Sequence, residues 1–207
     1  MSWRGLCAVL SMVGLLMVGC SDTPTVEVPD EEVCLDRSDG ARYCIDVYEA
    51  SREDADRATA GLMDDGRARS LPDRVPWTDI NWSGARSACE RSGKRLCALD
   101  EWVDACDGVP GDGGNTYVYG DTLDATRCNT MNMGIEPTGL RETCKALSMT
   151  YDQSGNVYEW TGGSMGSAAA RGGGPQSSQT HRCVDAFPNA PPNEANTEIG
   201  FRCCRSI

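Results

Sequence analysis

The sequence predicts one small domain that combines short helices with short strands and is held together by disulfides. Residues 33–207 have the length of a single domain. The hydrophobic core is thin, because the chain has only two phenylalanines and its aliphatic residues are scattered among Gly, Asp, Asn and Ser. Twelve cysteines can supply the missing cross-links. Apolar residues recur at strand spacing in some stretches and at helical spacing in others.

Residues 1–19 are interpreted as a lipoprotein signal peptide. Arg4 provides the positive charge, and residues 6–18 form an apolar run that is too short to span a bilayer. The run leads to Val18-Gly19-Cys20, where small residues precede a cysteine that lipoprotein processing would acylate. The alternative is an ordinary secretory signal with a chance cysteine. We expect a lipid anchor at Cys20 to be the only membrane attachment, and Ser21 favours the outer membrane.

Residues 20–32 are predicted to form an acidic tether that its prolines keep extended. The whole chain has a net charge of −12, so nothing in it would displace the counterions of a nucleic acid. We therefore expect no nucleic-acid partner. We interpret the negative charge as a source of solubility at an exposed surface.

Ten cysteines remain once Cys7 is removed with the signal and Cys20 is acylated. An even number in an exported chain predicts disulfides. Zinc binding is the weaker alternative, because His181 is the only histidine and no Cys-x-x-Cys pair occurs. Cys34 and Cys44 flank a Ser-Asp-Gly turn sequence, so we expect them to clip a hairpin.

Two stretches are predicted to be helices. Ser83 is the expected N-cap of the first helix, and Gly93 is the residue that ends it. The second helix is short, with Leu99, Trp102 and Cys106 on its inward face.

Residues 43–52 alternate like a strand, and residues 53–74 are interpreted as a surface loop. The glycine-rich residues 108–120 lack the Gly-Lys-Ser/Thr of a phosphate loop and are predicted to be a connector.

Residues 151–163 combine a turn with a predicted strand at residues 157–160, whose aromatic side chains would anchor the core. Asp152 and Glu159 could bind Ca²⁺ together with the backbone carbonyls of Gly155 and Val157, because calcium loops place oxygen ligands at such offsets. The alternative is a hairpin whose acidic side chains face the solvent.

Five blocks of sequence resemble the formylglycine-generating enzyme (sulfatase-modifying factor) family. They occur in the family's order and span roughly residues 44–204. The resemblance implies a compact, irregular α+β fold that is related to C-type lectins and poor in regular structure. The blocks are Gly93-Lys94-Arg95-Leu96 followed by Glu101-Trp102, Tyr117-Val118-Tyr119-Gly120-Asp121, Gly155-Asn156-Val157-Tyr158-Glu159-Trp160-Thr161, Arg171-Gly172-Gly173 and Gly200-Phe201-Arg202-Cys203.

The resemblance also implies disulfides and a further calcium ligand. Family members pair cysteines at the positions of Cys89 with Cys203 and of Cys106 with Cys183. The remaining four have no firm counterpart in the family, and our assignment is Cys128–Cys144 and Cys97–Cys204. Asn129 matches a family asparagine that helps to bind Ca²⁺, and Glu136 or Glu142 could complete that site.

The family's oxidase chemistry needs two cysteines after the Arg-Gly-Gly block, whose thiolates bind copper. In this chain the corresponding segment contains Ser177 and Ser178, and its single Cys183 matches a structural cysteine. A hydrolase triad with His181 is disfavoured, because there is no nucleophile elbow and no acid placed to orient the histidine. Copper is therefore not expected.

We expect a non-catalytic, lipid-anchored module of the cell envelope that binds a protein or a glycan. One alternative is a copper-dependent oxidase of the formylglycine-generating type with unusual ligands. Another is a lectin-like carbohydrate binder, which the fold suggests by analogy and for which Glu136-Pro137 resembles part of a sugar-binding tripeptide.

Overall fold

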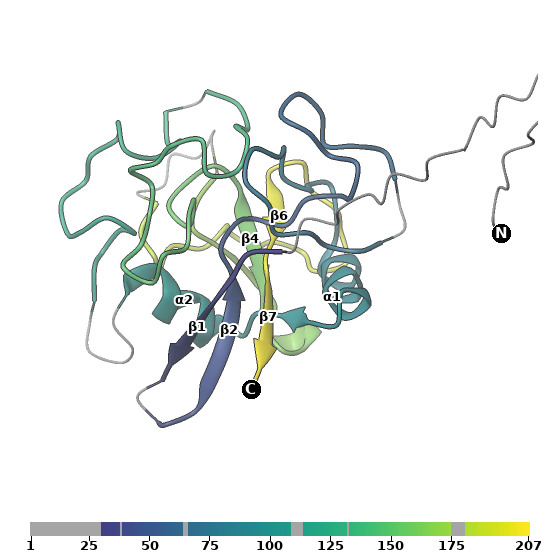
Figure 1. Ribbon diagram of the computed structural model, residues 1–207, viewed down its shortest axis with the longest axis horizontal. Coiled ribbons are helices and arrows are strands. Elements are labelled where there is room, and N and C mark those ends of the chain that lie inside the picture. Colours follow the sequence, from purple (N-terminus) through teal and green to yellow (C-terminus); the bar gives the residue numbers. More distant parts are fainter. Residues whose placement is uncertain (1–29, 38, 64–65, 109–113, 132, 175–180) are drawn as a thin grey trace, which may run out of the picture.

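The computed structural model describes residues 30–37, 39–63, 66–108, 114–131, 133–174 and 181–207. The strands form a four-stranded sheet in the order β1-β2-β7-β3 and a three-stranded sheet in the order β5-β4-β6. In Figure 1 the two α-helices lie on either side of the strands, and long loops make up much of the rest. The compact α+β fold with little regular structure is thus confirmed. The elements are β1 Glu32–Asp36, β2 Arg42–Asp46, α1 Trp82–Arg91, β3 Arg95–Leu96, α2 Leu99–Asp107, β4 Tyr158–Thr161, the 3₁₀ turn Met165–Ser167, β5 Ala169–Arg171, β6 Ile199–Phe201 and β7 Cys203–Ser206.

The N-terminal hairpin joins β1 to β2, and Cys34 lies directly opposite Cys44 in its register. The predicted strand at residues 43–52 is shorter than expected, because β2 ends at Asp46. Beyond that point the chain turns toward the other sheet, where the amide of Ala50 donates to the carbonyl of Phe201 at 2.8 Å. This turn carries Glu49 into the interior, where its side chain is fully buried.

The N-cap of helix α1 lies two residues before Ser83, where it was expected. Asn81 is the N-cap, and its side chain accepts a hydrogen bond from the amide of Gly84 at 2.8 Å. The earlier start brings Trp82 into the helix and buries it in the core. Gly93 follows the helix with φ +72°, the left-handed conformation that ends a helix most readily at glycine. The second helix matches its prediction and ends at Gly108, which is also left-handed.

The interior contains two apolar clusters. The first packs α1 against β4 and β6 and includes Trp82, Trp160 and Phe201. The second lies against α2 and β2, and six of its twelve buried members are cysteines. Disulfides therefore fill the space that aliphatic side chains occupy in a larger core, as the thin core predicted.

Five disulfides join the ten cysteines of the described part of the chain. They are Cys34–Cys44, Cys89–Cys203, Cys97–Cys204, Cys106–Cys183 and Cys128–Cys144, the same pairs that the sequence analysis expected. Cys203 and Cys204 are neighbours on β7 but belong to different clusters, because adjacent strand residues point to opposite faces. Within the described residues, no helix has the length and apolar character needed to cross a membrane.

Candidate functional site: a buried polar centre

Strand β4 places the Gly-Asn-Val-Tyr-Glu-Trp stretch in the middle of the three-stranded sheet. It pairs antiparallel with β5 and parallel with β6. Tyr158 and Trp160 belong to the first apolar cluster, as predicted. Glu159 lies on the opposite face and is fully buried, and Asp152 is only 4% exposed. The alternative in which these acids face the solvent is therefore wrong.

Arg202 lies at the centre of this polar region and is completely buried. Its Nε and one Nη donate to the two carboxylate oxygens of Glu159 at 2.7 and 2.6 Å. Its remaining donors bond the backbone carbonyls of residues 46, 47 and 151 at 2.8–3.2 Å. All five N–H groups of the guanidinium are therefore used, which is what a buried charge requires.

Glu159 accepts a third hydrogen bond, from the indole Nε1 of Trp102 at 2.7 Å. Helix α2, strand β4 and the segment between β6 and β7 thus meet at one carboxylate. Because Arg202 neutralises this group and both of its oxygens have donors, Glu159 does not fit its predicted role as a calcium ligand. The spacing between Asp152 and Glu159 in the sequence identified Glu159 as a polar residue of the site. It did not indicate that Arg202 is its partner.

Glu49 is a second buried carboxylate in this centre, and the sequence analysis did not single it out. It accepts hydrogen bonds from Asn156 Nδ2 at 2.6 Å and from the amide of Val157 at 3.2 Å. The turn before β4 is therefore tied to the segment after β2, more than a hundred residues away in sequence. Glu49 falls in an alternating stretch that predicts only a strand, so no local signal marks it.

The carboxylates outnumber the guanidinium in this centre. Burial raises the pKa of Asp152 to about 7, although a hydrogen bond from the Gly139 amide opposes the shift. Burial also raises the pKa of Glu49 well above its ordinary value, and the nearby charges of Asp152 and Glu159 add to the effect. A proton or a cation is therefore favoured close to these two groups.

Asn129 is the predicted calcium ligand that best fits a cation. Its Nδ2 donates to the carbonyl of Gly134 and to Asn156 Oδ1, at 2.7 and 3.0 Å. Its Oδ1 is buried and has no hydrogen-bond partner in the described structure. A buried oxygen without a donor is unfavourable unless a ligand contacts it. The left-handed Gly155 packs against Asn129, where an added Cβ would lie 2.5 Å from the backbone oxygen.

Glu136, considered above for sugar or calcium binding, is also engaged. Its two carboxylate oxygens accept hydrogen bonds from Arg141 at 2.7 and 2.8 Å. This bidentate pair with Arg141 offsets the charge of the Glu136 carboxylate.

The segment after the Arg-Gly-Gly block offers no reactive sulfur among the described residues. Cys183 is buried and bonded to Cys106, and Ser177 and Ser178 lie outside the described residues. His181 is buried against Gly173, and its Nδ1 has no hydrogen-bond partner in the described structure. Burial lowers the pKa of this histidine.

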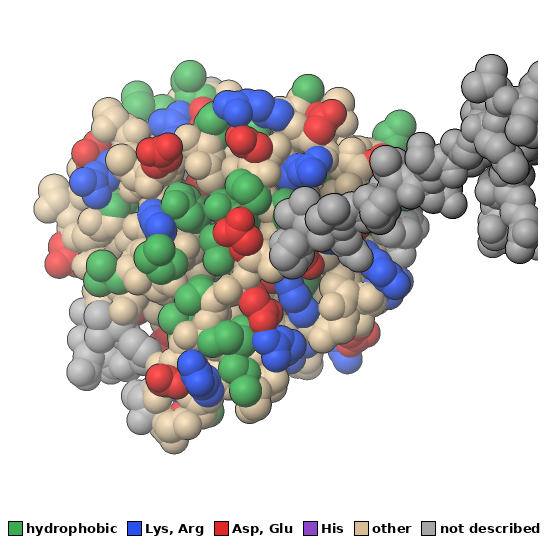
Figure 2. Space-filling view, viewed as in Figure 1, with side chains coloured by type: hydrophobic (Ala, Val, Ile, Leu, Met, Phe, Trp, Pro, Cys, Tyr) green, Lys and Arg blue, Asp and Glu red, His purple; other side chains and the backbone are tan. Residues whose placement is uncertain are grey.

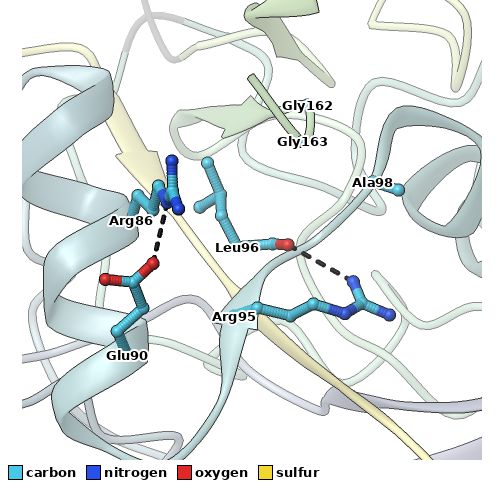
Figure 3. A pocket seen from close by; sticks show the side chains of 7 residues that line it. All are labelled: Arg86, Glu90, Arg95, Leu96, Ala98, Gly162 and Gly163. Carbon is cyan, nitrogen blue, oxygen red and sulfur yellow. Dashed lines mark hydrogen bonds and ion pairs between the residues drawn. The ribbon is translucent and has the colours of Figure 1, made fainter. Parts of the chain in front are cut away.

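A surface pocket of about 320 Å³ lies between α1 and the glycines that follow β4 (Figure 3). Arg86 lines it and pairs with Glu90 at 2.8 Å, while Arg95 pairs with Glu101 at 2.6 Å. Leu96 lies between the two arginines in the figure. Because each cation already has a carboxylate partner, the pocket has no excess charge with which to select an ion.

Curated relatives with sequence similarity include two inactive Cα-formylglycine-generating enzymes 2. The one from Bos taurus is 28% identical over 151 residues, which cover 62% of this chain and 49% of the relative. The one from Mus musculus is 26% identical over 155 residues, with coverage of 64% and 49%. This chain thus spans about half the length of these relatives.

Solved structures show the same fold at low sequence identity. CarF has a TM-score of 0.58 and 18% identity, covering 86% of this chain and 99% of CarF. PvdO from Pseudomonas aeruginosa has a TM-score of 0.52 and 18% identity, with coverage of 87% and 93%. The sulfatase-modifying factor enzyme 1-like domain model matches residues 41–207, which is most of the chain. The chain therefore belongs to the sulfatase-modifying factor enzyme 1-like domain family.

Proposed function

We propose that this protein is a non-catalytic member of its family that acts as a binding or structural module at the cell envelope, anchored through a lipid on Cys20. One observation carries the proposal: Cys183, the single cysteine in the segment after Arg-Gly-Gly, is bonded to Cys106. Copper oxidase chemistry needs two free thiolates in that segment. The names of the two similar mammalian proteins, which call them inactive, agree with this reading.

The experiment is to incubate the purified protein with Cu(I), O₂, a reductant and a Cys-x-Pro-x-Arg peptide, and to look for the aldehyde by mass spectrometry. We expect no conversion, while an active family member converts the peptide under the same conditions. Conversion by this protein would overturn the non-catalytic proposal. The variant Cys183→Ser would then show whether Cys183 takes part.

The lipid anchor is tested separately, in a diderm bacterium that is fed labelled palmitate. The wild-type protein should incorporate the label and Cys20→Ser should not. Cys20 lies outside the described residues, so the proposal rests on the sequence Val18-Gly19-Cys20. Equal labelling of both proteins would contradict it.

A structural calcium ion is the cofactor that we propose, with Asn129 Oδ1 and Asp152 as its side-chain ligands. The carbonyls of Gly155 and Val157 would add further oxygens to the shell of about six to eight that Ca²⁺ takes. The support is the buried Oδ1 of Asn129, which lacks a donor, together with the excess of carboxylates nearby. An ion bound only by the folded protein raises the melting temperature, so a chelator should lower it.

Variants separate the two sets of proposed calcium ligands. Asn129→Ala should lose the response to the chelator. Glu159→Gln should keep this response although the protein is less stable overall, because Glu159 pairs with Arg202. The same chelator response in Asn129→Ala as in the wild type would place the ion elsewhere.

A further inference from the structure

The turn at residues 145–151 presents two large apolar side chains to the solvent. Leu147 is 70% exposed and Met149 is 52% exposed. Between them, Ser148 is buried, and its hydroxyl donates to the carbonyl of Ala105 in α2 at 2.6 Å. The buried side chain of Thr150 contacts the same hydroxyl at 2.8 Å. Two inward polar residues therefore hold the two outward apolar residues in place.

The backbone of this turn is also fixed. The amide of Ala146 donates to the carbonyl of Thr150 at 2.8 Å, and the amide of Met149 donates to the carbonyl of Ala146 at 3.0 Å. Met149 has φ +78°, a conformation that disfavours any side chain larger than glycine's hydrogen. The hydrogen bonds and the left-handed Met149 therefore hold the two exposed apolar side chains in one fixed arrangement.

A groove of about 340 Å³ runs beside this turn. Its walls are Leu35 and Asp36 of the hairpin, Asp104 of α2, and Leu147. Gly108 allows the turn to approach the helix, since an added Cβ there would lie 2.8 Å from Leu147 Cβ. We name this feature the Leu147 groove. Figure 2 shows hydrophobic side chains gathered on the face that carries the β1–β2 hairpin.

The charge that lines the Leu147 groove is negative. Asp104 is only partly exposed, and its carboxylate forms neither a hydrogen bond nor an ion pair with any described residue, although the charge of Arg37 acts on it. Burial raises the pKa of its carboxyl group. Asp36 is paired with Arg42 at 3.2 Å, and its side chain is 83% exposed. A groove that combines two leucines with an acid outside any ion pair is complementary to an apolar side chain next to a cation.

We propose that the Leu147 groove binds a segment of a partner protein in which a lysine or arginine adjoins a large apolar side chain. Leu147 and Leu35, which both line the groove, would cover the apolar part, and Asp104 would pair with the cation. The proposal rests on the function proposed above, because it names the class of partner for a binding module.

The test uses two fluorescein-labelled peptides of equal length, one that alternates leucine with lysine and one that alternates leucine with glutamate. Fluorescence anisotropy of the peptides with the purified intact protein should show binding of the leucine–lysine peptide only. Leu147→Ser and Asp104→Asn should each weaken that binding by about tenfold or more. Leu62→Ser is the matched control, since Leu62 is 94% exposed and does not line the groove. This variant should bind the leucine–lysine peptide with the same affinity as the wild type.

Equal affinity in all three variants would overturn the proposal, because the peptide would then be held by the net negative charge alone. Absence of binding to the wild type would overturn it as well. Leu35→Ser provides a second apolar variant, because Leu35 also lines the groove. The melting temperature of each variant shows that it is folded. A negative result in the peptide-binding test does not change the result of the oxidase assay. The proposed partner of the Leu147 groove and the proposed non-catalytic function can therefore be refuted separately.

Discussion

The interior around Arg202 and the turn at residues 145–151 reverse the usual placement of side chains. Arg202 and Glu159 are charged and completely buried, whereas Leu147 is apolar and 70% exposed. In the interior each donor of the guanidinium has an acceptor, so removing one partner leaves a buried charge. In the turn, hydrogen bonds hold the backbone, and the exposed apolar side chains contribute little to the stability of the fold. The comparison separates residues needed for stability from residues available for binding.

Removal of both Cys89–Cys203 and Cys97–Cys204 should be the most severe change to the interior. These bonds span 114 and 107 residues, and each keeps almost the same long loop closed when the other is absent. The variant with all four cysteines changed to alanine should lose more than about 4 kcal/mol in urea unfolding, whereas Cys89→Ala/Cys203→Ala alone should lose about 2–3 kcal/mol. Cys34→Ala/Cys44→Ala, which opens a separation of 10 residues, should also lose about 2–3 kcal/mol. Equal losses in the four-cysteine variant and in Cys34→Ala/Cys44→Ala would show that chain entropy does not set the difference.

Arg202→Met should destabilise the domain by about 3–5 kcal/mol, since it leaves Glu159 buried without a counter-charge. The measurement is the free energy of unfolding in urea. Arg86→Gln is the control, because it breaks an exposed pair with Glu90 and should cost less than about 1 kcal/mol. Adding Glu159→Leu to Arg202→Met should recover part of the loss. A small change in the free energy of unfolding for Arg202→Met alone would show that the Arg202–Glu159 pair is not needed for stability.

Stability should fall as the pH rises from about 4 to 7. The carboxyl of Asp152 has a pKa of about 7 in the folded protein and an ordinary value of 3.8 when unfolded. The folded state therefore holds a proton that the unfolded state has lost in this window, and the contribution is on the order of 2–4 kcal/mol. Glu49 shifts in the same direction.

The measurement is urea unfolding at a series of pH values without added calcium. Asp152→Asn should flatten the profile, because the amide does not titrate and asparagine accepts the left-handed backbone at this position. Glu90→Gln, at an exposed site, should leave the slope unchanged. A profile that rises toward pH 7 in the wild type would contradict this prediction.

Leu147→Ser should change the free energy of unfolding by less than about 0.5 kcal/mol, since the side chain lies largely in water. Ser148→Ala in the same turn should cost about 1–3 kcal/mol, because the buried carbonyl of Ala105 loses its donor. Thermal and urea unfolding of both variants measure the difference. A large loss for Leu147→Ser would show that the side chain supports the fold.

The elements and disulfides were predictable where one short stretch carries the signal. Gly93 and Gly108 end their helices as glycine should, and the turn between Cys34 and Cys44 indicated the hairpin. The start of α1 was misplaced because Asn81 and Ser83 are both acceptable N-caps. Only the packing of Trp82 decides between them.

The polar centre was less predictable, because its members lie far apart in the chain. The offset between Asp152 and Glu159 suggested that both bind one ion. Glu159 instead forms an ion pair with Arg202, which lies 43 residues later in the sequence. Glu49 is separated from Asn156 by 107 residues. Such pairs depend on the tertiary structure, and no local spacing encodes them.

The adjacent cysteines of β7 impose an order on biosynthesis. Cys89 and Cys97 are bonded to Cys203 and Cys204, so neither bond can form until these C-terminal residues have been synthesised. Until then both N-terminal thiols are open to wrong partners, including Cys106, Cys128 and Cys144. An exchange between the two neighbours would require each sulfur to reach across the strand to the opposite cluster. The two disulfides of β7 are therefore the last that can form. A chaperone or disulfide isomerase would act mainly on the pairing of Cys203 and Cys204.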